Sequence, residues 1–178
     1  MKILGIDPGT SKAGFGLVEQ AAPMVIGGRT EHRPGRIYLV ASGDIASRSD
    51  TPISKRLKEI FVKVQGLIEE YRPDAIAVES SFLHKNVQTA IKLGQARGAV
   101  LIAAEISSIP VFEYTPREIK LALVGYGAAE KEQTQWMVKK ILGEDMVPDS
   151  NHASDALAVA ICHIHSAKIR GLIQAGLR

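Results

Sequence analysis

The spacing of hydrophobic residues along the chain predicts strands at its beginning and mainly helices afterwards. The apolar run of residues 3–6 leads directly into Asp7 and stops at the turn-forming pair Pro8-Gly9, which is typical of a buried strand. Two further strand-like runs cover 13–19 and 37–43, and the segment between them contains the Pro, Gly and Arg residues of a loop. These three strands favour an antiparallel meander.

Helical spacing of apolar residues begins after Thr51-Pro52, where Thr51 is expected to cap the helix. The amphipathic pattern continues to residue 71 and stops before Pro73. A short apolar strand over 74–79 then ends in Glu79. The remaining predicted elements are a helix over 86–107, a strand over 110–114, and helices over 116–124, 129–142 and about 150–168. This order predicts an α/β domain with a mixed five-stranded sheet, an antiparallel meander plus parallel strands, flanked by helices.

Composition narrows the class of protein without identifying it. The 178 residues fit one domain over 1–168, followed by a tail, 169–178, that we expect to be frayed. No apolar stretch approaches the roughly 20 residues that cross a bilayer, and the single Cys162 fits a reducing setting. We therefore expect a cytoplasmic protein without a membrane partner. The net charge of +3 and isoelectric point near 9.0 permit a nucleic-acid partner but do not demonstrate one.

Four polar side chains stand where apolar runs meet polar residues. Asp7 and Glu79 end predicted strands, while His152 and Asp155 are three residues apart and share one face at the start of the last helix. Each has an ordinary interpretation by itself. Asp7 would bond the amides of its own turn, and Asp155 would compensate the helix dipole beside a capping Asn151.

Together the four side chains favour a metal site. Several carboxylates in one cleft repel each other and raise each other's pKa unless a divalent cation neutralises them. Oxygen-rich ligand sets suit Mg²⁺ or Mn²⁺, which leave coordination positions for water and a substrate phosphate. Such a site hydrolyses phosphodiesters, so a metal-dependent nuclease is the function that these residue types predict.

Five segments resemble, in order, the successive motifs of the RuvC family of Holliday junction resolvases: GIDPGTS, AVESSFLHKN, KLGQARG, PREIKLALVGYGAAEK and SDALAVAICHIH. The resemblance extends from Met1 to about Ser166. It implies a ribonuclease H-like fold and a homodimeric, divalent-metal-dependent endonuclease. This enzyme would symmetrically nick two strands of like polarity at a four-way DNA junction in recombination and repair, leaving 5′-phosphate and 3′-hydroxyl ends. The resemblance also implies a branch-migration helicase complex of the RuvA and RuvB type as a partner.

The resemblance assigns catalytic and metal-binding roles to four residues. Asp7, Glu79 and Asp155 fall on family carboxylates, whereas His152 falls where many members carry a further Asp. These residues would hold one or two ions per subunit. An imidazole brings one less negative charge and a softer donor, which favours Mn²⁺ relative to Mg²⁺. Whether His152 is a ligand or a base, and how many ions bind at once, is left open.

Five further residues are predicted to contact DNA. Phe82 resembles the family's exposed aromatic residue that stacks on bases at the junction, and Lys85 and Asn86 follow as phosphate contacts. Lys120 and Lys131 match two basic family positions near the scissile phosphate. The ordinary alternatives are a core phenylalanine and solvated surface lysines.

Several alternatives remain at this stage. Gly94 and Gly98 lie one helical turn apart, which permits close packing either on the sheet or against a second copy of the chain. Actin-like and sugar kinases share the opening strand and its Asp-x-Gly-Thr loop, but they are about twice this length and carry a second Gly-rich phosphate motif. A junction-binding module with a decayed site is the non-enzymatic alternative. The preferred cleavage sequence cannot be predicted, because it depends on loop geometry and on distortion of the junction.

Overall fold

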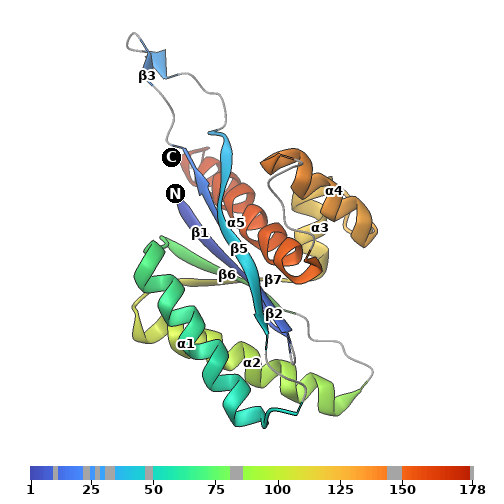
Figure 1. Ribbon diagram of the computed structural model, residues 1–178. Helices are drawn as coiled ribbons and strands as arrows, with labels where there is room; N and C mark the ends of the chain where they lie inside the picture. The colour runs from blue at the N-terminus through green and yellow to red at the C-terminus, as the bar shows by residue number, and fades with distance from the viewer. Residues whose placement is uncertain are drawn as a thin grey trace.

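A five-stranded sheet separates two layers of helices (Figure 1). The computed structural model describes residues 1–9, 12–21, 25–26, 29–30, 35–46, 50–80, 86–143 and 150–176. Across the sheet the strands follow the order β5 (Ile37–Ala46), β2 (Lys12–Gln20), β1 (Lys2–Asp7), β6 (Ala75–Glu79) and β7 (Val111–Tyr114). A separate two-stranded sheet pairs β3 (Val25–Ile26) with β4 (Arg29–Thr30).

The sheet is mixed, as the sequence predicted. β1 and β5 both pair with β2 in antiparallel fashion, which forms the meander. β6 pairs in parallel with β1 on one side and with β7 on the other. Because β1 and β6 run in the same direction, the acidic residues that follow their apolar runs meet at one edge of the sheet.

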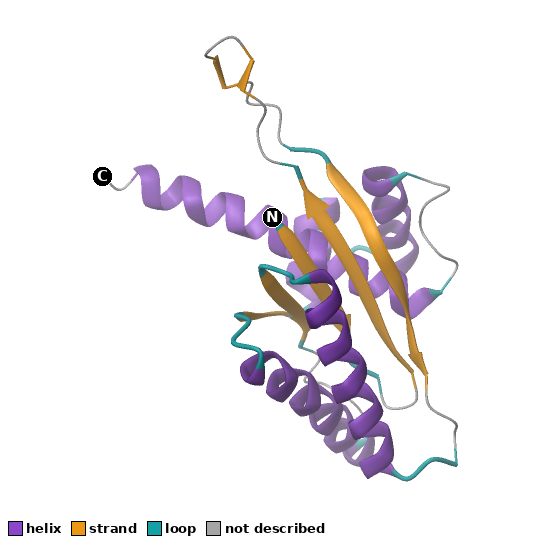
Figure 2. Cartoon of the chain, turned by 60° about the vertical axis from the view of Figure 1, so that its left-hand side comes forward, coloured by secondary structure: helices purple, strands orange, loops and turns teal. Residues whose placement is uncertain are grey.

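Alternation along the strands gives each helical layer its own core. In β1, Ile3 faces one layer, while Leu4 and Ile6 face the other. The helices α1 (Ile53–Tyr71) and α2 (Val87–Ile106) cover the second of these faces. The opposite face is covered by α3 (Pro116–Val124), α4 (Lys131–Leu142) and α5 (Asn151–Gly176). Figures 1 and 2 show these layers from two directions.

The α5 helix lies directly on the sheet because the strands beneath it carry glycine. A Cβ atom added at Gly5 would lie 2.0 Å from the carbonyl oxygen of Ala156, and one at Gly14 would lie 1.9 Å from that of His152. Residues 153, 154 and 156–164 of α5 are buried. Close contact between the helix backbone and the sheet therefore fixes the position of the helix's first turns.

Local capping fixes the starts of α3 and α4. Thr115 forms a capping box with Glu118, whose carboxylate accepts the Thr115 backbone N–H at 2.8 Å. At α4, the backbone N–H of Glu130 donates to the side chain of Gln133 at 2.8 Å. These caps determine where Lys120 and Lys131 leave their helices.

Of two sequence predictions about helix ends, the structure contradicts one and leaves the other a prediction. The predicted cap at Thr51 is wrong: α1 begins at Ile53 and Pro52 is the N-cap residue, with no side-chain capping bond. Proline cannot cap with a side-chain acceptor, so the first amides of α1 gain no such partner. At the other end, α5 continues to Gly176, and the frayed tail at 169–178 stays a prediction. In the described part of the chain, every helix is too short or too polar to cross a membrane.

Candidate active site

Two carboxylates meet at the edge of the sheet where β1 and β6 end. In the parallel pairing of these strands Ile6 lies beside Val78, so Asp7 and Glu79 occupy the next positions on adjacent strands. Both side chains line a cavity of about 120 Å³ that lies between the strand ends and α2. The prediction that the two acids end neighbouring central strands is confirmed.

The first turn of α5 adds an imidazole and a third carboxylate to the same place. His152 Nδ1 lies 3.0 Å from Asp7 Oδ2, which joins the start of the helix to the end of β1. Asp155 interacts electrostatically with both Asp7 and Glu79. The structure thus brings together the four residues that sequence analysis singled out as catalytic.

The close approach of α5 at Gly14 makes a prediction about activity. In Gly14→Ala the new methyl group would overlap the His152 carbonyl, so the start of α5 must move away from β2. We expect a loss of about 1–3 kcal/mol in the free energy of unfolding. We also expect an approximately 10²-fold loss of the nuclease activity that the sequence predicts, because displacing a group of a catalytic site by about 1 Å has such effects. Denaturant titration and a cleavage assay measure the two quantities.

A matched glycine serves as the control. A Cβ added at Gly66 of α1 has no heavy atom within 4 Å, so Gly66→Ala should gain about 0.5–1 kcal/mol from its helix propensity and leave cleavage unchanged. Equal stability and activity of Gly14→Ala and the native chain would show that α5 does not depend on contact at this point.

The electrostatics of the site are those of crowded acids. Burial raises the pKa of Asp7, and the charge of Asp155 raises it further, against the opposing effects of His152 and Lys131. Burial, together with the charges of Asp7 and Asp155, raises the pKa of Glu79 to about 7. Glu79 therefore carries a proton for part of the time near neutral pH, and added positive charge would favour its ionised form.

A second cavity on the other side of Glu79 has two lysines in its lining together with two of the acids. It measures about 220 Å³ and includes Glu79, Asp155, Lys120 and Lys131 in its walls. The ammonium group of Lys131 donates to Asp155 Oδ2 at 2.6 Å. Although burial alone lowers the pKa of Lys131, its bond to Asp155 and the charges of three acids raise it above its usual value, so this lysine is charged.

The remaining predicted DNA contacts are less well placed by the structure. Phe82 and Lys85 lie outside the described residues. The side-chain oxygen of Asn86 accepts the backbone N–H of Thr89 at 3.2 Å and so caps α2. A DNA contact by Asn86 stays a prediction.

Sequence reasoning missed Arg97, which lines the α2-side cavity together with Asp7 and Glu79. Its guanidinium holds Glu113 of β7 through two hydrogen bonds, one of them 3.2 Å long from Nε to Oε1. This pair joins α2 to the sheet beside the two acids. The only signal in the sequence is a basic residue inside the KLGQARG motif, one turn after Gly94.

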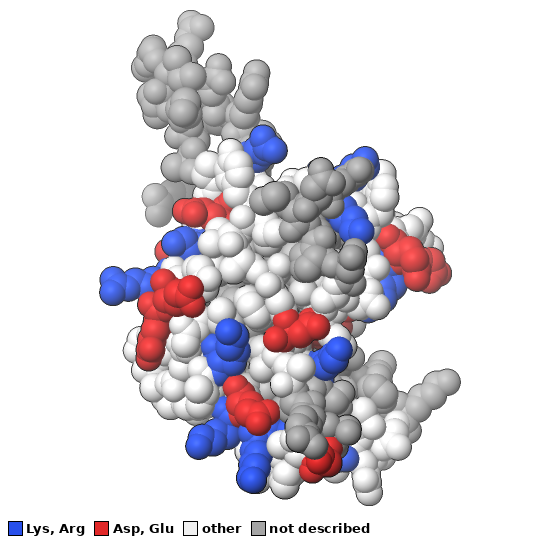
Figure 3. Space-filling model, viewed as in Figure 1, with Lys and Arg blue, Asp and Glu red and all other residues white. Residues whose placement is uncertain are grey.

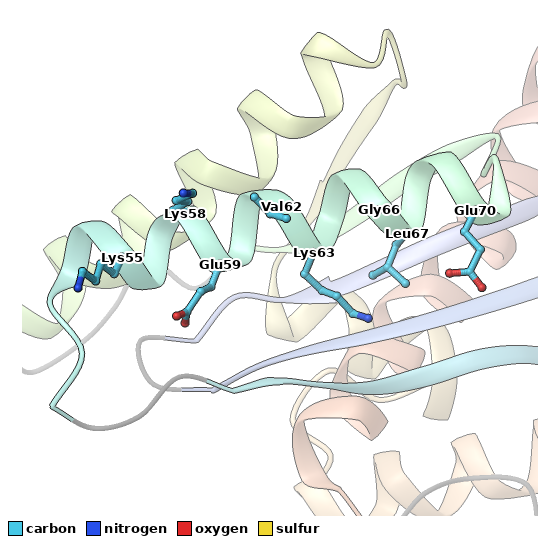
Figure 4. A pocket seen from close by; sticks show the side chains of 8 residues that line it. All are labelled: Lys55, Lys58, Glu59, Val62, Lys63, Gly66, Leu67 and Glu70. Atoms are coloured by element: carbon cyan, nitrogen blue, oxygen red, sulfur yellow. The ribbon is translucent and has the colours of Figure 1, made fainter.

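A larger hollow of about 620 Å³ follows α1, away from these acids (Figure 4). Glu59, Lys63 and Leu67 point towards the strands in this view. The lining consists of three lysines, two glutamates, Val62, Gly66 and Leu67. On the face shown in Figure 3, acidic and basic side chains of the described residues are interspersed, in keeping with the small net charge of +3.

Comparison with known proteins decides the family. A family model described as "Crossover junction endodeoxyribonuclease RuvC" matches residues 3–163. This chain belongs to the RuvC family. The predicted enzyme class, an endodeoxyribonuclease that acts as a Holliday junction resolvase, is confirmed by this membership, and the kinase alternative is rejected.

Individual RuvC proteins and their structures agree. The RuvC protein of Syntrophomonas wolfei is 44% identical over 98% of this chain and 94% of its own length. That of Geobacter sulfurreducens is 45% identical over 98% of both chains. The structure of Thermus thermophilus RuvC matches with a TM-score of 0.83 and 34% identity, over 95% of this chain and 96% of that one. A structure of the same protein in complex with a Holliday junction substrate matches equally well. The predicted ribonuclease H-like fold is confirmed.

RuvC nucleases depend on a divalent metal ion, and the donor chemistry of the site fits one. Asp7, Glu79 and Asp155 offer the hard oxygen ligands that such ions prefer, and a cation would offset the burial and the repulsion that together raise the pKa of Asp7 and Glu79. Among the described residues, no three His, Cys, Asp or Glu side chains are arranged to hold an ion as they stand.

Proposed function

We propose that this RuvC chain cuts four-way DNA junctions with Asp7, Glu79, Asp155 and His152 as its catalytic residues, holding one or two divalent ions per subunit. The meeting of these four side chains at one edge of the sheet carries the proposal. When bound, the ion would supply the positive charge that activates water and stabilises the developing charge on the phosphate.

The chain's own residues have separate tasks. The contact between Asp7 and His152 Nδ1 leaves Nε2 as the nitrogen that can bind a metal or accept a proton from water. Lys120 and Lys131 line the cavity beside Glu79, where they would bind oxygens of the scissile phosphate and offset the charge that develops on the leaving group. Glu79, which lies in both cavities, would act in its ionised form.

The segment after β6 would contact the junction itself. Phe82, Lys85 and Asn86 follow Glu79 within seven residues and precede α2. A base stacked on Phe82 would contribute about 1–3 kcal/mol, which helps to unpair bases at the crossover. Lys85 and Asn86 would contact phosphates and so position the strand without reading its sequence.

A synthetic four-way junction tests the proposed function directly. Mg²⁺ or Mn²⁺ should allow the chain to nick two opposed strands of like polarity at symmetric positions, and DNA ligase should reseal the products because they carry 5′-phosphate and 3′-hydroxyl ends. A linear duplex of the same arm sequence is the control and should remain uncut. Equal cleavage of duplex and junction, or ends that cannot be ligated, would contradict the proposal.

His152 makes a prediction about the metal. Because imidazole is a softer donor than carboxylate, Mn²⁺ should support cleavage at least as well as Mg²⁺. His152→Asp should move this preference towards Mg²⁺. Metal-titrated cleavage by both proteins measures the ratio, and a strong Mg²⁺ preference in the native chain would argue against His152 as a ligand.

We also propose that the chain forms a homodimer through α2. The buried face of this helix contains Ala96, Val100 and Ala103, yet apolar residues also occupy its opposite side. Val87, Ile91, Ile102 and Ile106 are between 57% and 71% exposed. With Gly94 and Gly98 they form one stripe at helical spacing, here called the α2 stripe. A second copy of the helix would bury this stripe, and two subunits would supply the two sites that symmetric nicking requires.

A charge in the α2 stripe should separate the subunits. Ile102→Glu places a carboxylate where an apolar contact is proposed, so the variant should sediment as a monomer and lose coordinated cleavage of both strands. Val62→Glu is the matched control, since Val62 of α1 is 53% exposed but lies outside the stripe. A native chain that sediments as a monomer at micromolar concentration would contradict the dimer.

The branch-migration helicase complex of the RuvA and RuvB type is proposed as a partner from family membership alone. Reconstituted branch migration with this chain added would test it, by comparing cleavage with and without the complex.

A further inference from the structure

The hydrogen bond between Lys131 and Asp155 has a consequence for metal binding. The Lys131 ammonium donates to Asp155 Oδ2 at 2.6 Å, the length of a strong charge-assisted bond. One carboxylate oxygen of a proposed metal ligand is thus already bound to a positive charge of the protein itself.

The two side chains that form this bond differ in exposure and in freedom to move. Lys131 is the first residue of α4, and its side chain is 52% exposed, whereas that of Asp155 is 23% exposed. The lysine has a flexible four-carbon stem and can turn away from α5 at little cost. Asp155 belongs to α5 and lies one turn after His152, whose backbone contacts Gly14. Its backbone is therefore held in place.

We propose that Lys131 is an exchangeable internal cation: it neutralises Asp155 until a divalent ion binds there, and it is then released into the adjacent cavity to contact the DNA phosphate. This inference rests on the metal site proposed above. It assigns Lys131 two alternating partners, Asp155 before the ion binds and the DNA phosphate afterwards.

The balance of charge favours such an exchange. Three carboxylates, Asp7, Glu79 and Asp155, act on Lys131. A divalent ion among them brings twice the charge of the ammonium, so the attraction that holds Lys131 to Asp155 falls once the ion is present. The lysine then repels the ion and is attracted to a phosphate in the cavity that it shares with Lys120.

The exchange couples metal binding to DNA binding. Without DNA, Lys131 competes with the ion and weakens its binding. With DNA, the released ammonium gains a phosphate partner, so each ligand strengthens the other. A lysine that only contacts phosphate would have no comparable effect on metal affinity without DNA.

Calorimetric titration of the full chain with MnCl₂, without DNA and at pH 8, tests the competition. Lys131→Gln removes the charge and should bind Mn²⁺ more tightly than the native chain, by at least about fivefold. Lys131→Arg keeps a cation that can bond Asp155 and should bind Mn²⁺ nearly as the native chain does. Lys120→Gln is the matched control: it removes a charge from the same cavity and acts on Glu79, so it should change the affinity less, by under about twofold.

The outcomes separate this inference from the proposed function. If Lys131→Gln and Lys120→Gln tighten Mn²⁺ binding equally, or if neither does, the exchange is wrong while the metal site stands. If neither the native chain nor any variant binds Mn²⁺, the metal site itself is wrong, and the exchange with it.

Nuclear magnetic resonance of ¹⁵N-labelled lysine ammonium groups gives a second readout. The bond to Asp155 should slow proton exchange enough for one ammonium signal to be seen, and Lys131→Gln should remove that signal and so assign it. Saturating Mg²⁺ should shift or abolish the signal in the native chain. Its persistence at an unchanged position with Mg²⁺ bound would overturn the exchange.

Discussion

Asp7→Asn is expected to abolish cleavage of a four-way junction while junction binding stays intact. Asp7 ends the central strand β1, is only 18% exposed, and contacts His152 as well as lining the cavity with Glu79. Asparagine preserves the size of the side chain but removes the charge that would bind a cation. We expect a fall in cleavage rate of at least about 10³-fold, as for other residues that act as part of a catalytic unit.

Junction affinity should be unchanged or slightly tighter, since one negative charge near the DNA phosphates is lost. Electrophoretic mobility shift and single-turnover cleavage, measured on the same junction, separate the two effects. A variant that still cut at a rate near that of the native chain would show that Asp7 is not part of the catalytic site.

Asp44→Asn is the matched control. Asp44 of β5 lies opposite Gly14 of β2, which itself pairs with Asp7, so the two aspartates lie along one line across the sheet. Ser150 hydroxyl donates to Asp44, and an asparagine oxygen can still accept this bond. Cleavage and stability should both be close to those of the native chain.

Glu79→Gln should inactivate the enzyme and at the same time stabilise the metal-free fold above neutral pH. The pKa of Glu79 is raised from 4.5 to about 7, so the folded chain holds this proton more tightly than the unfolded chain does. Between pH 4.5 and 7 the folded state therefore binds more protons, and its stability falls as pH rises. The shift corresponds to a cost of up to about 3 kcal/mol at pH 8, which glutamine avoids.

Thermal unfolding in EDTA measures this effect. For a chain of this size the melting temperature of Glu79→Gln should exceed that of the native chain by about 5–10 °C at pH 8 and by little at pH 4.5. Glu105→Gln, at an exposed carboxylate on α2, is the control and should leave the melting temperature close to that of the native chain. A Glu79→Gln variant with the same melting temperature as the native chain at pH 8 would mean that ionised Glu79 does not destabilise the metal-free fold.

The cleavage rate of the native chain should follow the same ionisation in the opposite sense. If Glu79 acts as a carboxylate, as proposed above, activity should rise as pH increases through the neutral range, and added metal should move the midpoint to lower pH by favouring the ionised form. Cleavage rates that do not change from pH 5.5 to 8 would show that the ionisation of Glu79 does not control activity.

The sequence revealed the acids of the site because each one interrupts an apolar run. Asp7 and Glu79 end strands of buried character, and the parallel pairing of these strands in the structure brings their ends to the same edge of the sheet. Asp155 and His152 were found in the same way, at the polar start of an apolar helix. Local pattern was enough for these residues because burial itself marks their positions.

What the sequence did not reveal depends on contacts between distant elements. Arg97 and Glu113 lie on α2 and β7 and meet only when the helix packs on the sheet. The Lys131–Asp155 bond joins α4 to α5 across 24 positions in the sequence. Nothing in the sequence around either residue predicts this contact. The predicted cap at Thr51 was wrong for a local reason: α1 begins one residue later than expected, so Pro52 and not Thr51 is the N-cap residue.

The glycine contacts beneath α5 also determine where this enzyme can be altered. On the α1 and α2 side of the sheet, Leu4 and Ile6 meet other side chains, and such cores accept hydrophobic replacements of similar volume. Beneath α5 the helix backbone rests on Gly5 and Gly14, so a side chain added at either of these two positions cannot be accommodated by repacking of other side chains. Natural substitutions and engineered stabilising mutations should therefore be tolerated best in the core between the sheet and helices α1 and α2. Repacking there leaves the position of Asp155 unchanged.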